Sequence, residues 1–100
     1  MDPKFEKALA VWLTKAQAIV DKGHERYPNQ TRPVLSLEPG RRYVKVVRKE
    51  GGPGGSVHCF IDTTNGDVLK AAGWKKPAKG ARGNIFTDAL GVSEYGGLYL

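Results

Sequence analysis

The chain has 100 residues and a formal net charge of +6, because 16 Lys and Arg residues outnumber 10 Asp and Glu residues. That length supports one hydrophobic core, so we expect residues 1–100 to form a single domain. The lone cysteine excludes an intramolecular disulfide framework and favours a reducing, cytoplasmic location. No stretch approaches the roughly 18 apolar residues of a membrane span, so we expect no membrane partner. The basic balance favours acidic partners, nucleic acid being the commonest, although a moderate charge also serves solubility alone.

The N-terminal segment has the pattern of an amphipathic helix of about residues 3–22. Asp2 is a good N-cap, and Pro3 suits the first helical position. Gly23 is expected to end the helix in the left-handed conformation. Apolar residues recur at spacings of three and four, which predicts a face that covers a sheet: Phe5, Leu9, Trp12, Leu13, Ala16, Ile19 and Val20.

An extended connection is expected over residues 24–33, because it holds two prolines and no apolar period. The sheet and a basic loop are then expected over about residues 34–100. Four strands are predicted from β-branched and apolar runs bounded by turn residues. They are Val34–Leu37, Tyr43–Arg48, Val57–Ile61 and Val68–Ala72.

The turn between the last two strands leaves two registers open. A three-residue loop of Thr64, Asn65 and a left-handed Gly66 places Ile61 opposite Leu69, and we prefer it because the facing residues are then apolar. A two-residue loop would place Ile61 opposite Lys70.

Residues 73–84 hold a proline and several glycines, so regular structure is not expected there. Ile85 and Phe86 are expected to return as a short strand or an anchor. The C-terminal residues 95–100 are apolar enough to pack on the core or on a second subunit, which leaves a homo-oligomer open. The predicted class is α+β: a helix packed on an antiparallel meander of three to five strands, either a small half-barrel or a flatter layer.

The segment Lys75–Asn84, with the residues just before it, is the strongest candidate for a contact surface. It is cationic without a single acid, and glycines 80 and 83 flank Arg82, so the backbone there could approach a phosphate. Trp74 could stack on a base while the neighbouring cations meet phosphates. The candidate nucleic-acid-binding residues here are Trp74, Lys75, Lys76, Lys79 and Arg82.

A second basic group lies around the Tyr43 strand and supplies the candidates Arg41, Arg42 and Lys45. Alternation places Tyr43, Lys45, Val47 and Lys49 on one face of that strand. Lysines there could also protect an edge strand from unwanted pairing. If the two basic groups lie on the same face, they form a groove for a polyanion.

Other arrangements give no sign of catalysis or of a cofactor. His58 and Cys59 are adjacent in a strand and should point to opposite faces, so no thiolate–imidazole pair is expected. His24 and His58 lack metal-ligand spacing. Asp62 and Asp67 flank a turn, where Asp serves local hydrogen bonds. The glycine run of residues 51–55 lacks the ending of a P-loop and is expected to be a hairpin tip.

Residues 56–85 contain an Asn-Gly-Asp turn, a Leu-Lys-Ala-Ala strand and a Pro-Ala-Lys-Gly-Ala-Arg-Gly-Asn run. This block resembles a segment of small uncharacterised proteins of tailed bacteriophages. The resemblance implies a phage-like source and action in the cytoplasm of an infected bacterium, and it transfers no catalytic residue.

The sequence therefore favours a non-enzymatic accessory protein that binds a polyanion, with nucleic acid first. The alternative is a protein–protein module, such as a host-factor inhibitor or a virion component, that presents the same basic surface to an acidic protein.

Overall fold

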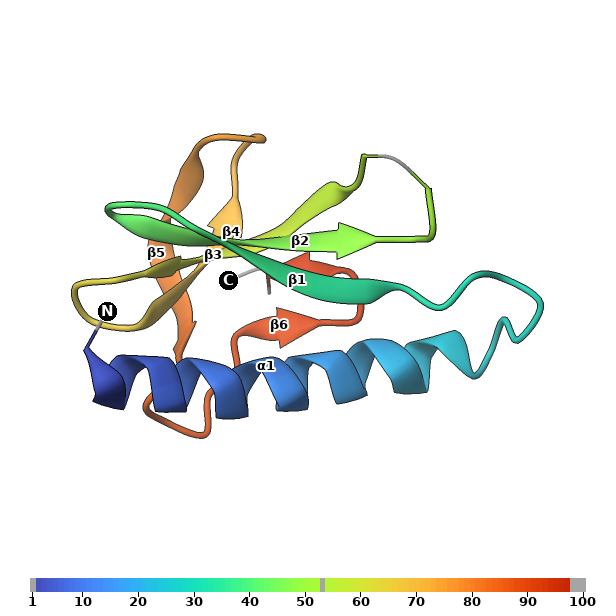
Figure 1. The fold of residues 1–100 in the computed structure, drawn as a ribbon, viewed down its shortest axis with the longest axis horizontal. Helices are drawn as coiled ribbons and strands as arrows, with labels where there is room; N and C mark the ends of the chain where they lie inside the picture. Colours follow the sequence, from blue (N-terminus) through green and yellow to red (C-terminus); the bar gives the residue numbers. More distant parts are fainter. Residues whose placement is uncertain (1, 53, 98–100) are drawn as a thin grey trace.

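The computed structural model describes residues 2–52 and 54–97. Its elements are α1 Pro3–His24, β1 Val34–Pro39, β2 Tyr43–Lys49, β3 Ser56–Asp62, β4 Asp67–Ala71, β5 Pro77–Asn84, β6 Val92–Ser93 and β7 Gly96–Gly97. Strands β1 to β5 form an open antiparallel meander, and β6 pairs with β7 in a short ribbon. The helix runs along one side of this meander (Figure 1). The predicted α+β fold is thereby confirmed.

The helix begins where the sequence predicted, because the Asp2 carboxylate accepts a hydrogen bond of 2.8 Å from the Lys4 amide. Its end was predicted wrongly. Gly23 is helical and has no positive φ, and the Glu25 amide still donates to the Asp21 carbonyl. The predicted extended connection also begins with turns, since the Tyr27 amide donates to the carbonyl of the last helical residue.

The helix packs on the sheet through apolar side chains that the sequence had largely identified. Trp12 is 1% exposed, and its indole nitrogen donates a 2.9 Å hydrogen bond to the Leu90 carbonyl. The core consists of Phe5, Leu9, Trp12, Ala16, Val20, Leu35, Val44, Val46, Cys59, Ile61, Val68, Ile85 and Val92. The helix therefore covers the sheet face that carries Val44, Cys59, Ile61 and Val68.

The turn between β3 and β4 corrects both predicted registers. Ile61 pairs with Val68 and Phe60 with Leu69, so the loop holds the four residues 63–66. The Gly66 amide donates to the Asp62 carbonyl at 2.8 Å, which closes this longer turn. Gly66 has a φ of 82°, as the left-handed prediction required. This register places two fully buried side chains, those of Ile61 and Val68, opposite each other in the core.

Residues 77–84 form strand β5, although the sequence predicted no regular structure there. Pro77 begins an edge strand, where a missing N–H group disturbs the ladder least. Leu69 pairs with Ala81 and Val68 with Gly83, which leaves Arg82 as an unpaired bulge residue. The glycine-rich segment is thus an irregular edge strand rather than a free loop. Of the two residues that follow it, Ile85 is a buried anchor and Phe86 is half-exposed.

Strand β2 also departs from its predicted description. It lies between β1 and β3, so its lysines do not guard a sheet edge. Val46 pairs with Cys59 and Val47 with Val57, which leaves His58 unpaired and breaks the alternation. Val47 is consequently buried rather than aligned with the exposed Lys49.

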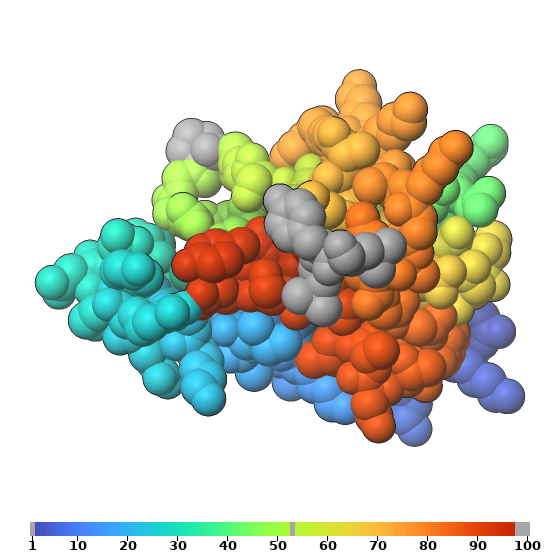
Figure 2. Space-filling view, turned by 180° about the vertical axis from the view of Figure 1, so that it is seen from behind, coloured from blue at the N-terminus to red at the C-terminus, as the bar shows by residue number. Residues whose placement is uncertain are grey.

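The C-terminal region adds a ribbon that the sequence did not predict. Val92 of β6 reaches the core, whereas Tyr95 in the turn is 72% exposed and does not pack as expected. Figure 2 shows this ribbon in red, above the blue helix. The predicted packing of residues 98–100 lies outside the described part of the chain.

Candidate functional site

The sheet face opposite the helix carries a small group of aromatic rings. Val44 and Ile61 point into the core, so their strand neighbours Tyr43, Lys45 and Phe60 point the other way. The rings of Tyr43 and Phe60 meet edge to face, with centroids 6.0 Å apart. Phe60 is buried, and it supports the partly exposed Tyr43 from beneath.

A shallow depression of about 360 Å³ lies beside these rings. It joins parts of the chain that are far apart in sequence, because the turn between β1 and β2 lines it together with Lys75 from the turn between β4 and β5. The lining residues are Glu38, Pro39, Gly40, Arg41, Arg42, Tyr43, Lys45, Phe60 and Lys75. Members of the two predicted basic groups therefore share one face.

Trp74 is attached to the same surface by a cation–π contact. The Lys45 ammonium lies 4.2 Å from the centroid of the Trp74 ring, which ties β2 to the turn after β4. The Trp74 side chain keeps 47% of its surface exposed. A second contact of this kind places the Arg42 guanidinium 5.4 Å from the Tyr43 ring centroid. Cations and aromatic rings thus alternate across the surface.

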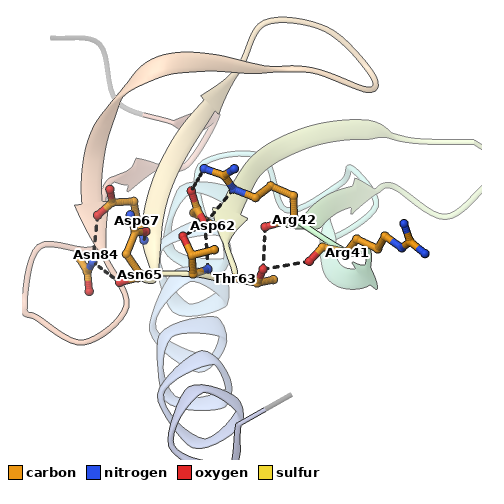
Figure 3. Close-up of polar contacts among 8 residues, drawn as sticks. Arg41, Arg42, Asp62, Thr63, Asn65, Asp67 and Asn84 are labelled. Carbon is orange, nitrogen blue, oxygen red and sulfur yellow. Dashed lines mark hydrogen bonds and ion pairs between the residues drawn. The ribbon is translucent and has the colours of Figure 1, made fainter.

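The arginine turn is held in place by the turn between β3 and β4, as Figure 3 shows. The Thr63 amide and hydroxyl both donate to the Arg42 carbonyl, at 2.9 and 2.8 Å, and the hydroxyl also reaches the Arg41 carbonyl. The Arg42 guanidinium donates to the buried carboxylate of Asp62 at 3.2 Å. Arg41 and Arg42 therefore project from a braced turn.

Asp62 is charged because of its partners. Burial would raise the pKa of this carboxyl, but hydrogen bonds from the amide and hydroxyl of Thr64, together with the Arg42 guanidinium, lower it overall. Its role is structural, in line with the local hydrogen bonding expected of a turn Asp. The second turn carboxylate, on Asp67, accepts a 3.0 Å hydrogen bond from the Asn84 side chain (Figure 3).

We expect Asp62→Ala to lower the free energy of unfolding by about 2 kcal/mol, because several charge-assisted hydrogen bonds are lost together. Urea denaturation followed by circular dichroism measures the effect. Asp62→Asn is the matched control, because its side-chain oxygen can still accept from the Thr64 amide; it should cost clearly less. Equal losses for the two variants would contradict the bracing role.

The remaining predicted residues lie apart from the depression or are less available. Lys76 is exposed beside Lys75, and Lys79 is exposed on β5. Arg82 is only partly exposed, and its Nε and Nη1 atoms are buried without a hydrogen-bond partner among the described residues. None of these three lines the depression.

The glycine beside Arg82 serves the chain's own packing. A Cβ at Gly83 would overlap the Ala89 carbonyl oxygen and the Gly91 backbone, so another strand connection already occupies that approach. The Asn84 amide donates to the same Ala89 carbonyl at 2.8 Å. The close approach that the sequence suggested at Gly83 is intramolecular.

Sequence reasoning missed Tyr43, Phe60, Asp62 and Thr63 as parts of this site. Alternation did place Tyr43 on the face of Lys45, which was a usable signal. The contribution of β3 could not be foreseen, because it depends on β3 lying next to β2 in the register now observed.

The groups considered for catalysis or metal binding do not converge. Burial raises the pKa of the Cys59 thiol, so this side chain behaves as a small apolar residue. Within residues 2–52 and 54–97, no three His, Cys, Asp or Glu side chains gather closely enough to hold a metal ion. The same part of the chain contains no helix with the length and apolar composition needed to cross a membrane.

Comparison with known proteins yields one family match. The model of the "Family of unknown function (DUF7717)" matches residues 3–99. No curated protein and no solved structure matches the chain.

Proposed function

The chain belongs to the DUF7717 family, and we propose that it is a non-enzymatic accessory protein that binds nucleic acid through the surface around the depression. We call this surface the basic–aromatic face and define it as Arg41, Arg42, Tyr43, Lys45, Trp74, Lys75 and Lys76. The observation that carries the proposal is the convergence of Arg41, Arg42, Lys45 and Lys75 on one depression from two distant turns.

The charges of this face are largely unspent. In the described part of the chain, ion pairs join Arg26 to Glu94, Arg32 to Asp21, Arg42 to Asp62 and Arg48 to Glu50. By contrast, no ion pair within those residues engages Arg41, Lys45, Lys75 or Lys76. Glu38 and Asp62 are the carboxylates nearest to these cations, so positive charge is in excess. An excess of this kind attracts a polyanion and concentrates it at the surface.

Phosphate contacts give this binding a measurable salt dependence. Four contacts to a single strand predict a slope of log affinity against log salt of about −3. Affinity should then fall roughly 50-fold between about 50 and 200 mM salt. The resemblance of residues 56–85 to tailed-phage proteins favours a setting in the host cytoplasm, where nucleic acid is abundant.

The test is a fluorescence anisotropy titration of the Arg41→Ala/Lys75→Ala variant against labelled DNA and RNA. We expect weaker binding and a salt slope smaller in magnitude by about two, because each lost phosphate contact removes about one. The matched control is Lys7→Ala/Lys15→Ala, which removes the same charge from the exposed side of α1.

Three results would count against the proposal. Equal losses in the two double variants would show that net charge alone drives binding. An unchanged affinity in Arg41→Ala/Lys75→Ala would place the site elsewhere. A wild-type protein that binds neither single- nor double-stranded DNA or RNA at low salt would leave an acidic protein as the partner for this surface.

A further inference from the structure

The basic–aromatic face offers flat ring surfaces as well as charge. Trp74 is half-exposed and Tyr43 is partly exposed, and both rings stand among cations rather than within the core. A surface evolved only to hold phosphates needs no such rings. Every nucleobase has a π-face that can stack on an aromatic side chain, whereas a duplex keeps those faces against neighbouring bases. The rings are therefore informative about the form of the nucleic acid.

We propose that the ligand of this face is single-stranded nucleic acid and that Tyr43 and Trp74 are its base-stacking residues. This inference rests on the proposed function and specifies its substrate class. Phosphates would lie against Arg41 and Lys75, which stand at the rim of the depression, while bases turn toward the rings.

The rings are held in fixed positions, which lowers the entropic cost of binding. Phe60 is 3% exposed and meets Tyr43 edge to face at an interplanar angle of 71°, so it acts as a positioning residue. The Lys45 ammonium positions Trp74 in a similar way and keeps a positive charge beside the ring. Base and phosphate groups would therefore meet sites that already exist.

The shape of the depression also favours an unstacked base. Its lining combines a ring, backbone and charged side chains, which suits a flat aromatic group with polar edges. Glu38 lines it too, and its carboxylate has no ion pair in the part of the chain that the structure describes. A carboxylate would repel phosphate, but it can accept a hydrogen bond from the amino group of a base. Glu38 is thus better suited to a nucleobase than to a simple polyanion.

The closing experiment compares a labelled 12-nucleotide single strand with the matching duplex at one fixed salt concentration. We expect the wild-type protein to bind the single strand at least tenfold more tightly. Trp74→Leu and Tyr43→Leu keep every charge and remove the rings; each should weaken single-strand binding about tenfold and leave duplex binding unchanged. Trp74→Phe and Tyr43→Phe keep a ring and should retain most of the affinity. Thermal melts confirm that each variant is folded.

The outcomes separate this inference from the proposed function. Equal binding of single strand and duplex, with no effect of either leucine variant, would overturn the stacking model while the charge-dependent function stands. Absence of binding to both ligands at low salt would overturn both. A loss in Trp74→Leu that Trp74→Phe does not recover would also contradict stacking, because it would trace the effect to another property of tryptophan.

Discussion

Trp12→Ala should lower the free energy of unfolding by about 3–5 kcal/mol, the typical cost of truncating a buried aromatic residue. The Trp12 ring is in the centre of the helix–sheet contact, and its indole nitrogen satisfies the Leu90 carbonyl. Domains of this size are stable by about 5–15 kcal/mol, so the variant should be close to unfolding at room temperature. Urea denaturation followed by far-ultraviolet circular dichroism measures the change without relying on the deleted fluorophore.

The chain supplies its own control for this prediction, because it has a second tryptophan. Trp74→Ala removes the same atoms from a half-exposed position and should cost less than about 1 kcal/mol. Trp12→Phe keeps most of the ring but leaves the Leu90 carbonyl without its donor, so an intermediate loss is expected. Similar losses for Trp12→Ala and Trp74→Ala would contradict the assigned core.

Stability should fall by about 3 kcal/mol between pH 6.5 and pH 4, because His58 is buried in its neutral form. Burial, reinforced by the nearby Arg48 guanidinium, lowers the pKa of His58 from 6.5 to about 4. The unfolded chain therefore binds a proton as the pH falls through 6.5, whereas the folded chain does so only near pH 4. Stability from neutral His58 is complete above pH 6.5 and lost as the pH falls to about 4.

The surroundings of His58 explain why no group offsets this penalty. The ring lies on the β3 bulge under the C-terminal ribbon, and its two nitrogens have no hydrogen-bond partner among the described residues. Lys70 and Tyr95 line the same hollow, and neither supplies a negative charge near neutral pH. A proton on the ring would thus be buried among neutral and cationic groups.

Chemical denaturation at half-unit pH steps, with His58→Leu as the test variant, checks this prediction. The variant should lose the decline between pH 6.5 and 4. His24→Gln, at the helix end, is the control and should retain it. Carboxyls with lowered pKa values, such as Asp62 and Glu94, contribute further losses only at lower pH. A wild-type curve that is flat from pH 7 to pH 4.5 would contradict the burial of neutral His58.

The sequence predicted the parts of the fold that depend on local pattern. The helix start follows from the Asp2 cap and Pro3, and the strand positions follow from β-branched runs. Features that depend on pairing were missed. The four-residue turn closed by Asp62, the bulge at His58 and the strand status of residues 77–84 arise from neighbours distant in sequence. Glycine and proline suggested a loop, but pairing with β4 and a bulge accommodate them.

The same division holds for the candidate site. The residues Lys45, Trp74 and Lys75 could be selected from charge and aromatic content, and the structure places them side by side. Arg82 appeared accessible because glycines flank it, yet its bulge partly buries the guanidinium. Tyr43 was overlooked because its environment is provided by Phe60 on the next strand. Residue type thus indicated the chemistry, and the sheet determined which residues share a surface.

The central claim is that nucleic acid binds the basic–aromatic face, and amide chemical-shift mapping by NMR tests it most directly. Titration of the ¹⁵N-labelled protein with a short single-stranded oligonucleotide should shift the amides of residues 41–45 and 73–76, together with the Trp74 indole signal. The buried Trp12 indole should stay in place and serve as an internal control. Shifts confined to α1 or to the C-terminal ribbon, or no shifts at low salt, would contradict the account.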